Sequence, residues 1–136
     1  MIRDGWFRTG DAGYVDRDGF FFINDRIKDM IVTGSENVYP AEVEAVLEGH
    51  PDLVEVAVIG VPDPKWGESV KACVVKRKDS TLTAHALIDW CRDKLAGYKR
   101  PRSVDFLDAL PRNASGKMLK RSLREPYWAG YERRVK

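Results

Sequence analysis

A glycine followed by a lysine, Gly116-Lys117, is the pair in this sequence that most directly suggests chemistry, because such a pair ends the loop that cradles nucleotide phosphates. The spacing excludes that loop here. The glycine required five positions earlier falls at Pro111, and Met118 stands where a serine or threonine is required. Lys117 remains a candidate for chemistry, because it is a flexible cation at the end of a loop of small residues. The alternative is that Lys117 is only an exposed lysine in a turn, with no chemical role.

Metal-binding patterns also fail on spacing. The segment Asp16–Gly19 suggests a calcium loop, but the register would place Tyr14 at the first ligand position and Phe22 at the ninth. The segment is therefore predicted to be a turn. Cys73 and Cys91 lack the spacing of a zinc site, and the two histidines stand apart. We predict no metal site built by the protein.

The composition is that of one ordinary globular domain. The chain has 136 residues, of which 43% are hydrophobic and 32% charged, too apolar for intrinsic disorder. No apolar run approaches the roughly 20 residues of a membrane span, and residues 1–10 lack the pattern of a secretory signal. We expect a cytoplasmic protein without a membrane span.

Charge is divided unevenly along the chain, although the net charge is only +2. Residues 1–91 carry 10 Lys and Arg against 16 Asp and Glu, whereas residues 92–136 carry 13 against 5. The last third is a candidate anion-binding surface. The alternative is a solvated basic face followed by a tail.

Hydrophobic periodicity predicts the elements that would position these residues. Residues 12–24 read as a β-hairpin, Ile31-Val32 as a short strand, and Pro40 as the first residue of a helix that ends near Glu48. The remaining predicted elements are strands at Val54–Val61, Ser69–Val75 and Val104–Leu107, a helix from Thr83 to Gly97, and a basic helical turn at Leu119–Arg124 that Pro126 interrupts. The order predicts an α+β fold, a small three-stranded sheet with packed helices preceded by a β-hairpin.

Five stretches stand out in order: Trp6–Asp11, Asp25–Ile31, Gly34–Glu44, Tyr98–Pro101 and Leu110–Lys117. On them the sequence resembles the C-terminal part of the adenylate-forming superfamily, which includes acyl-CoA synthetases, luciferases and the adenylation domains of peptide synthetases. The resemblance covers residues 5–125. Asp25-Arg26 and residues 36–40 look most like fatty-acyl and aryl CoA ligases. Ser35 departs from the pattern, because such ligases usually carry a second glycine there.

The resemblance implies two reaction steps. A carboxylate attacks ATP and expels pyrophosphate, and the acyl group then passes from the acyl-adenylate to coenzyme A. The implied cofactors are ATP with Mg²⁺, bound mainly by a large N-terminal domain that also holds the acyl pocket, and coenzyme A as co-substrate. That domain and a carboxylic acid are the expected partners, with no nucleic acid, and the present chain is expected to be inactive alone.

The resemblance also implies roles for individual residues. Lys117 is the expected catalytic cation of the adenylating step, because negative charge gathers at the α-phosphorus. Asp11 and Arg26 are expected to bind ATP or AMP, Asp11 through the ribose hydroxyls. A turn role for Asp11 and a surface ion pair for Arg26 are the alternatives.

Domain rotation is implied as well, with the hinge at Lys28. Residues 1–25 would form a hairpin and the end of the N-terminal domain, 26–28 the hinge, 29–125 the lid domain and 126–136 a basic tail. Gly34, with Ser35 and Glu36, is expected to line the coenzyme A thiol channel, where a glycine backbone can approach the ligand closely. The alternative for Gly34 is a plain turn. Coenzyme A phosphates are expected to contact Arg92, Lys99 or Arg100.

A rival hypothesis is a free-standing basic module that binds nucleic acid or a protein partner through residues 92–136. RNA-binding sheets alternate aromatic and basic residues, which would support it. The aromatic run 20–22 is instead consecutive and flanked by acidic residues. The sequence therefore favours the enzymatic interpretation.

Overall fold

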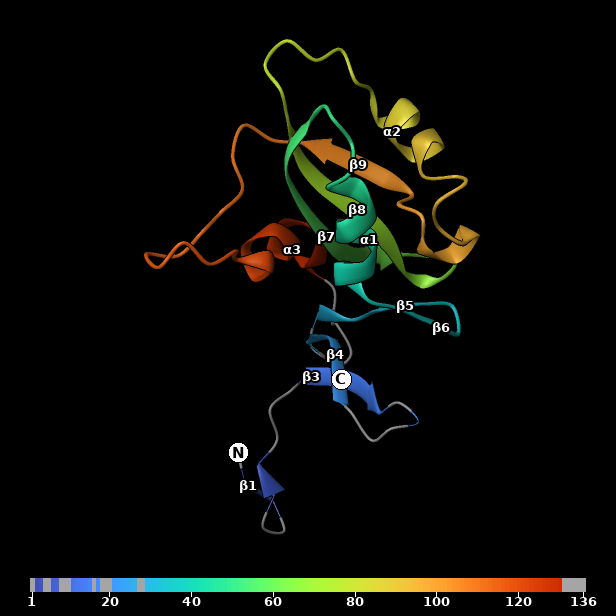
Figure 1. Cartoon of the computed structure of the whole chain (residues 1–136), viewed down its shortest axis with the longest axis vertical. Helices are drawn as coiled ribbons and strands as arrows, with labels where there is room; N and C mark the ends of the chain where they lie inside the picture. The colour runs from blue at the N-terminus through green and yellow to red at the C-terminus, as the bar shows by residue number, and fades with distance from the viewer. Residues whose placement is uncertain are drawn as a thin grey trace.

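The structure is a computed structural model that describes residues 2–3, 6–7, 11–15, 17, 21–26 and 29–130, with side chains described at residue 17 and at 29–130. Within these ranges, three α-helices pack on a five-stranded sheet, and two small antiparallel sheets precede it (Figure 1). The predicted α+β class is confirmed.

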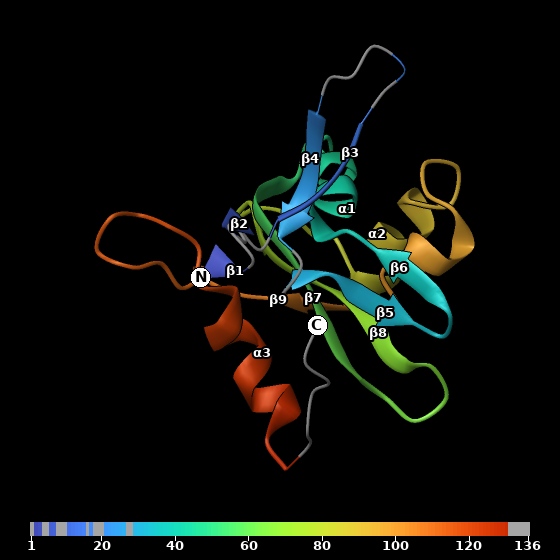
Figure 2. The same cartoon turned by 90° about the horizontal axis from the view of Figure 1, so that it is seen from below.

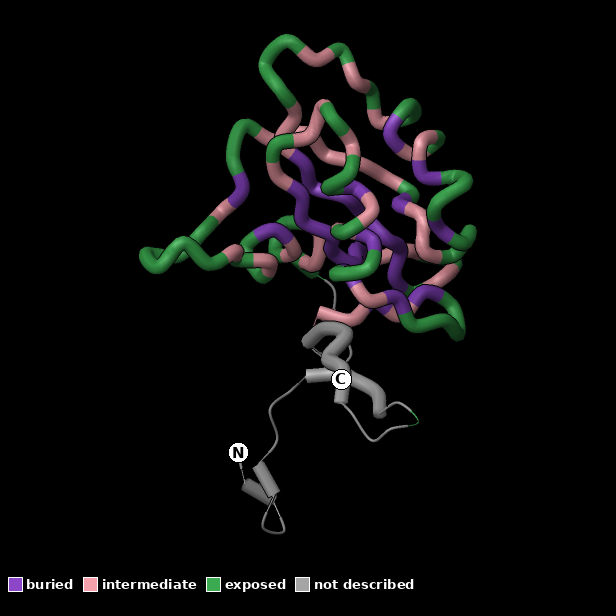
Figure 3. Tube along the Cα trace, viewed as in Figure 1, coloured by how far each residue is buried: buried purple, intermediate pink, exposed green. Residues whose placement is uncertain are grey.

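The sheet is built on one long antiparallel hairpin, β7 (Leu53–Asp63) with β8 (Gly67–Lys76). Most of its residues are apolar, because helices cover both faces, and the buried stretches coincide with these strands (Figure 3). α1 (Pro40–Leu47) and α2 (Ala84–Trp90) pack on one face and α3 (Lys120–Trp128) on the other (Figure 2). The two resulting cores contain Val43, Leu47, Val56, Val58 and Leu87 on one side, and Ala57, Ile59, Val61, Leu110 and Leu123 on the other.

The sheet has five strands, not the three predicted. β9 (Ser103–Phe106) runs parallel to β8, as expected for a strand that follows a helix. The extra strands are β5 (Ile31–Thr33) and β6 (Glu36–Val38), which form a short hairpin. Thr33 pairs with Gly67 at the start of β8, so the hairpin extends the sheet. Such pairing depends on distant chain segments, which local periodicity does not report.

The helix starts were predicted well and the helix ends less well. α1 begins at Pro40, and the Thr83 hydroxyl caps α2 by accepting the N–H of Ala86 at 3.1 Å. α2 ends at Trp90 instead of near Gly97. α3 was predicted to end at Arg124, but it continues through Pro126 to Trp128. Residues 126–128 therefore belong to the folded domain instead of a tail.

The predicted N-terminal hairpin is present as β3 (Asp11–Val15) paired with β4 (Phe21–Arg26), in a sheet separate from the central one. A still shorter pair, β1 (Ile2–Arg3) and β2 (Trp6–Phe7), precedes it. Residues 27–30 connect the β3–β4 hairpin to β5. Across the described ranges, no helix is both long and apolar enough to cross a membrane.

Candidate functional site

Lys117 lies in a loop that projects from the body of the protein between Leu110, which is buried, and α3 (Figure 2). Asn113 organises this loop from within. Its side-chain oxygen accepts the backbone N–H groups of Ser115 at 3.0 Å and Lys117 at 2.9 Å, and also the Ser115 hydroxyl at 2.7 Å. Gly116 adopts a φ of +83°, a conformation that glycine reaches without strain. The backbone at Lys117 is therefore fixed locally.

The Lys117 side chain is exposed. Within residues 29–130 its ammonium makes no hydrogen bond or ion pair. The neighbouring cation behaves differently, because Arg112 pairs with Glu55 at 2.6 Å and donates to the carbonyl of Gly116 at 3.0 Å. Arg112 thus braces the loop, and Lys117 is left able to reach a group outside this fold.

The two predicted nucleotide-binding residues are brought together. Asp11 and Arg26 are direct cross-strand partners at the open end of the β3–β4 hairpin. Adjacent strands hold such partners about 4.5–5.5 Å apart at Cα or Cβ. The predicted hinge residue, Lys28, lies outside the described residues.

Gly34 forms the turn between β5 and β6 with a φ of +62°. Its N–H donates to the carbonyl of Trp66 at 2.8 Å, and a Cβ at this position would lie 3.1 Å from Trp66 Cε3. Both the backbone conformation and the closeness of the aromatic ring therefore favour glycine. The following residues, Ser35 and Glu36, are exposed, so this turn presents its backbone, one small side chain and one carboxylate to solvent.

Trp66 is a residue of this site that the sequence patterns did not indicate. Its ring lies 4.9 Å from the Lys65 ammonium and 5.3 Å from the Arg102 guanidinium. The half-buried ring and its two cations adjoin Gly34, and such a surface suits an aromatic or anionic ligand. The one local signal was a tryptophan between lysine and glycine in a turn. Its proximity to Gly34 arises from tertiary structure.

Asp63 holds Trp66 in place from the end of β7. Its carboxylate accepts the N–H groups of Lys65 at 2.8 Å and Trp66 at 3.0 Å. The bonds from Trp66 and Lys65 stabilise the ionised form and lower the pKa of Asp63 from its ordinary value of 3.8.

The three predicted phosphate-contacting cations differ in how they are held. Lys99 lies in the 3₁₀ helix Gly97–Lys99, which contacts β6, and its ammonium bonds Glu42 at 2.8 Å. That hydrogen bond raises the pKa of Lys99. Arg100 donates to the carbonyl of Leu95 at 3.0 Å. Arg92, at the end of α2, pairs with Asp89 at 2.6 Å and is largely exposed. Lys99 thereby lies in an element that contacts the strand after the Gly34 turn.

The cysteines have no role in such a site. Burial raises the pKa of the Cys73 thiol to about 11 and also raises the pKa of Cys91, so neither is a thiolate at neutral pH. In the part of the chain that the structure describes, no three His, Cys, Asp or Glu side chains are grouped to hold a metal ion.

Comparison with known proteins identifies the family to which this fold belongs. The family described as the AMP-binding enzyme C-terminal domain matches residues 42–117. A feruloyl-CoA synthase from an Amycolatopsis species is 53% identical over 127 residues, 93% of this chain and 26% of its own length. The fatty acid–[acyl-carrier-protein] ligase ScoC of Streptomyces coeruleorubidus is 51% identical, over 98% of this chain and 26% of its own.

Among solved structures, ATP-bound MatB from Rhodopseudomonas palustris superposes with a TM-score of 0.86 at 42% identity, covering 97% of this chain and 26% of that one. The chain thus spans about a quarter of the length of the relatives it matches. With the family match over more than half of its residues, this chain belongs to the AMP-binding enzyme C-terminal domain family.

Proposed function

We propose that this chain is the C-terminal lid domain of an ATP-dependent acyl-CoA synthetase for a fatty or aryl carboxylic acid. Lys117 is its catalytic cation, and the observation that carries the proposal is an exposed ammonium without a partner in residues 29–130, on a loop fixed by Asn113. Two of the relatives named above are a feruloyl-CoA synthase and a fatty acid–[acyl-carrier-protein] ligase, and their names support that class of acid.

In the adenylating step, a carboxylate oxygen bonds to the α-phosphorus of ATP while the bond to the pyrophosphate oxygen breaks. Negative charge accumulates on the oxygens around phosphorus, and a lysine ammonium near both the carboxylate and the phosphate stabilises that transition state. Asp11 would accept hydrogen bonds from the ribose hydroxyls, and Arg26, its cross-strand partner, would donate to nucleotide oxygens.

In the second step, the coenzyme A sulfur attacks the acyl carbonyl, the thiol proton is lost and AMP leaves. The Gly34 turn, with Ser35 and Glu36, would admit the pantetheine arm, since glycine leaves the backbone uncovered. Arg100 and Lys99 would face the coenzyme A phosphates. Trp66 and Arg102, beside the same turn, extend this surface.

The remaining parts of the site belong to the rest of the longer enzyme in this proposal. That part would supply the acyl pocket and hold ATP with Mg²⁺. The connection at residues 26–28, between the β3–β4 hairpin and the five-stranded sheet, is the proposed hinge. We place the enzyme in the cytoplasm.

The test is Lys117→Ala in the full-length enzyme that contains this chain. Adenylation, measured as acid-dependent pyrophosphate exchange into ATP, is expected to fall on the order of 10²-fold or more, since a transition-state electrostatic partner is lost. Thioester formation from supplied acyl-adenylate should change little. Lys78→Ala, which removes an exposed lysine from the turn after β8, is the matched control.

A loss of adenylation below about tenfold would contradict the role of Lys117. Salt-sensitive binding of arbitrary DNA by the chain at micromolar concentration would instead support the free-standing basic module.

A further inference from the structure

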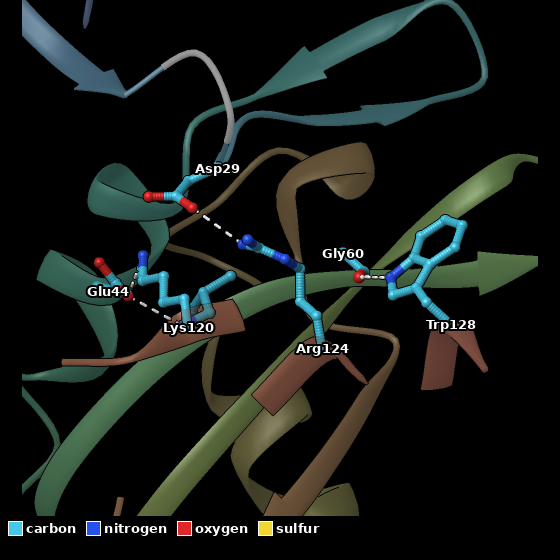
Figure 4. A network of polar contacts seen from close by, with 7 residues as sticks. Asp29, Glu44, Gly60, Lys120, Arg124 and Trp128 are labelled. Carbon is cyan, nitrogen blue, oxygen red and sulfur yellow. Dashed lines mark hydrogen bonds and ion pairs between the residues drawn. The ribbon is translucent and has the colours of Figure 1, made fainter. Parts of the chain in front are cut away.

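α3 is attached to the rest of the domain by polar contacts along one face. Lys120, Arg124 and Trp128 follow one another at four-residue intervals, so their side chains lie on the same side of the helix (Figure 4). Each reaches a different part of the chain. Lys120 pairs with Glu44 of α1 at 2.8 Å, and the Trp128 indole donates to the carbonyl of Gly60 at 2.9 Å.

Arg124 makes the contact of longest range in this set. Its guanidinium donates to the carboxylate of Asp29 at 2.9 Å, across 95 positions of sequence. The two side chains are only 12% and 13% exposed. Removing one partner of such a pair leaves a charge without compensation in a poorly hydrated place. Asp29 is therefore held firmly against α3.

A second arginine on the same helix shows what an unconstrained pair looks like. Arg121 approaches Glu125 at 3.6 Å, with the side chains 87% and 68% exposed. Exposed pairs of this kind contribute little to stability or position. Arg121 thus provides a control of the same residue type, three positions away from Arg124.

The start and the middle of α3 lie next to the two segments that the proposed function uses. Lys120 opens the helix three residues after Lys117. Asp29, the partner of Arg124, directly follows the connection 26–28. A chain of contacts therefore runs from the exit of that connection, through Arg124 and α3, to the loop that carries Lys117.

We propose that Arg124 is a positioning residue that, through Asp29, fixes the first residues after the connection 26–28 to α3, so that the domain carrying Lys117 turns as one body. The inference rests on the proposed function, because rotation of the domain matters only if the domain takes a different orientation in each of the two half-reactions. Without the anchor, motion about the hinge would spread into Met30–Thr33, and each reorientation of the domain that carries Lys117 would be slower.

Hydrogen exchange on this chain tests the anchor directly. In Arg124→Ala the amides of Met30–Thr33 are expected to exchange at least about tenfold faster, while those of β8 change less than about threefold, because local opening does not require global unfolding. Arg124→Lys, which keeps the charge, should recover most of the protection. Arg121→Ala should leave both sets unchanged.

Kinetics on the full-length enzyme test the positioning role. Adenylation alone and thioester formation from supplied acyl-adenylate should each stay within about threefold of wild type in Arg124→Ala, because neither needs repeated reorientation. Overall thioester synthesis from acid, ATP and coenzyme A requires it in every cycle and should fall about tenfold or more. Arg124→Lys should restore most of the overall rate, and Arg121→Ala should match wild type.

Two results would overturn the inference. The first is an Arg124→Ala enzyme that matches Arg121→Ala in all three assays. The second is an equal loss in all three assays with faster exchange throughout β8, since Arg124 would then only stabilise the fold. A wild-type enzyme that forms no acyl-adenylate would refute the proposed function itself, and the inference with it. That result differs from a failure of the Arg124 inference, because it is observed in the wild-type enzyme, before any residue is substituted.

Discussion

Asn113 illustrates how one uncharged side chain can fix the backbone position of the proposed catalytic cation, Lys117. Its oxygen gathers three donors from Ser115 and Lys117, and its carbonyl accepts the N–H of Gly116 at 2.9 Å. Asn113 itself is exposed, so its side chain contributes little buried surface to the stability of the fold. Its contribution is to the conformation of the loop.

Asn113→Ala is accordingly expected to reduce adenylation by about tenfold in the full-length enzyme, since misplacement of a reacting group is costly. Stability should change by less than about 1 kcal/mol, as for most exposed positions. Asn113→Asp is the matched control, because a carboxylate accepts the same three hydrogen bonds. Pyrophosphate exchange and urea unfolding are the measurements. Equal adenylation in Asn113→Ala and wild type would show that the loop does not need this organiser.

The parts of the candidate site that lie in short local stretches were predictable from the sequence. The part that tertiary packing brings together was not. Lys117 and Gly34 stand in loops whose residue types already indicate exposure and backbone freedom. Trp66 gave no comparable signal. It reaches Gly34 only because Thr33 pairs with Gly67 and brings two turns to one edge of the sheet.

The helices and strands show the same difference between features set locally and features set by distant contacts. The starts of α1 and α2 were predictable because a proline and a capping threonine act within one turn. The passage of α3 through Pro126 was not, because Arg124 and Trp128 are held by partners on distant segments. Those contacts outweigh the hydrogen bond that a proline removes from a helix. The β5–β6 hairpin joined the sheet for a comparable reason, through pairing with β8.

The turn between β7 and β8 gives an element whose stability depends on pH. The pKa of Asp63 is lowered on folding, so its ionised form stabilises the native state fully above the ordinary value of 3.8, and this contribution is lost as the pH falls through the lower folded value. Asp63→Ala should lower the free energy of unfolding by about 1 kcal/mol near neutral pH, the usual size of a lost hydrogen bond.

The measurement is urea unfolding of Asp63→Ala and wild type between pH 7 and pH 2, in which the gap between them should close below about pH 4. Asp79→Ala, which removes an aspartate from the exposed turn after β8, is the control. A gap that stays constant down to the lowest pH would show that the Asp63 charge contributes nothing to this turn.

At the scale of the whole molecule, the candidate functional groups are exposed and lie outside the two apolar cores. The cores on the two faces of the sheet are apolar, whereas Lys117, Ser35 and Glu36 are all exposed. A domain of this kind can fold around its own sheet and still lack an enclosed place for a nucleotide. Folding and activity are therefore expected to separate when the chain is studied alone.

The 136-residue chain should unfold cooperatively in urea, and Lys117→Ala should shift its free energy of unfolding by less than about 0.5 kcal/mol, because an exposed side chain without a local partner is removed. The same chain, given a fatty or aryl acid, ATP, Mg²⁺ and coenzyme A, should release no measurable pyrophosphate, with the full-length enzyme as the positive control. The electrostatic effect of Lys117 requires a carboxylate and an α-phosphate held beside it in a site that excludes water. Turnover by the chain alone within about tenfold of the full-length enzyme would mean that this fold builds that site by itself.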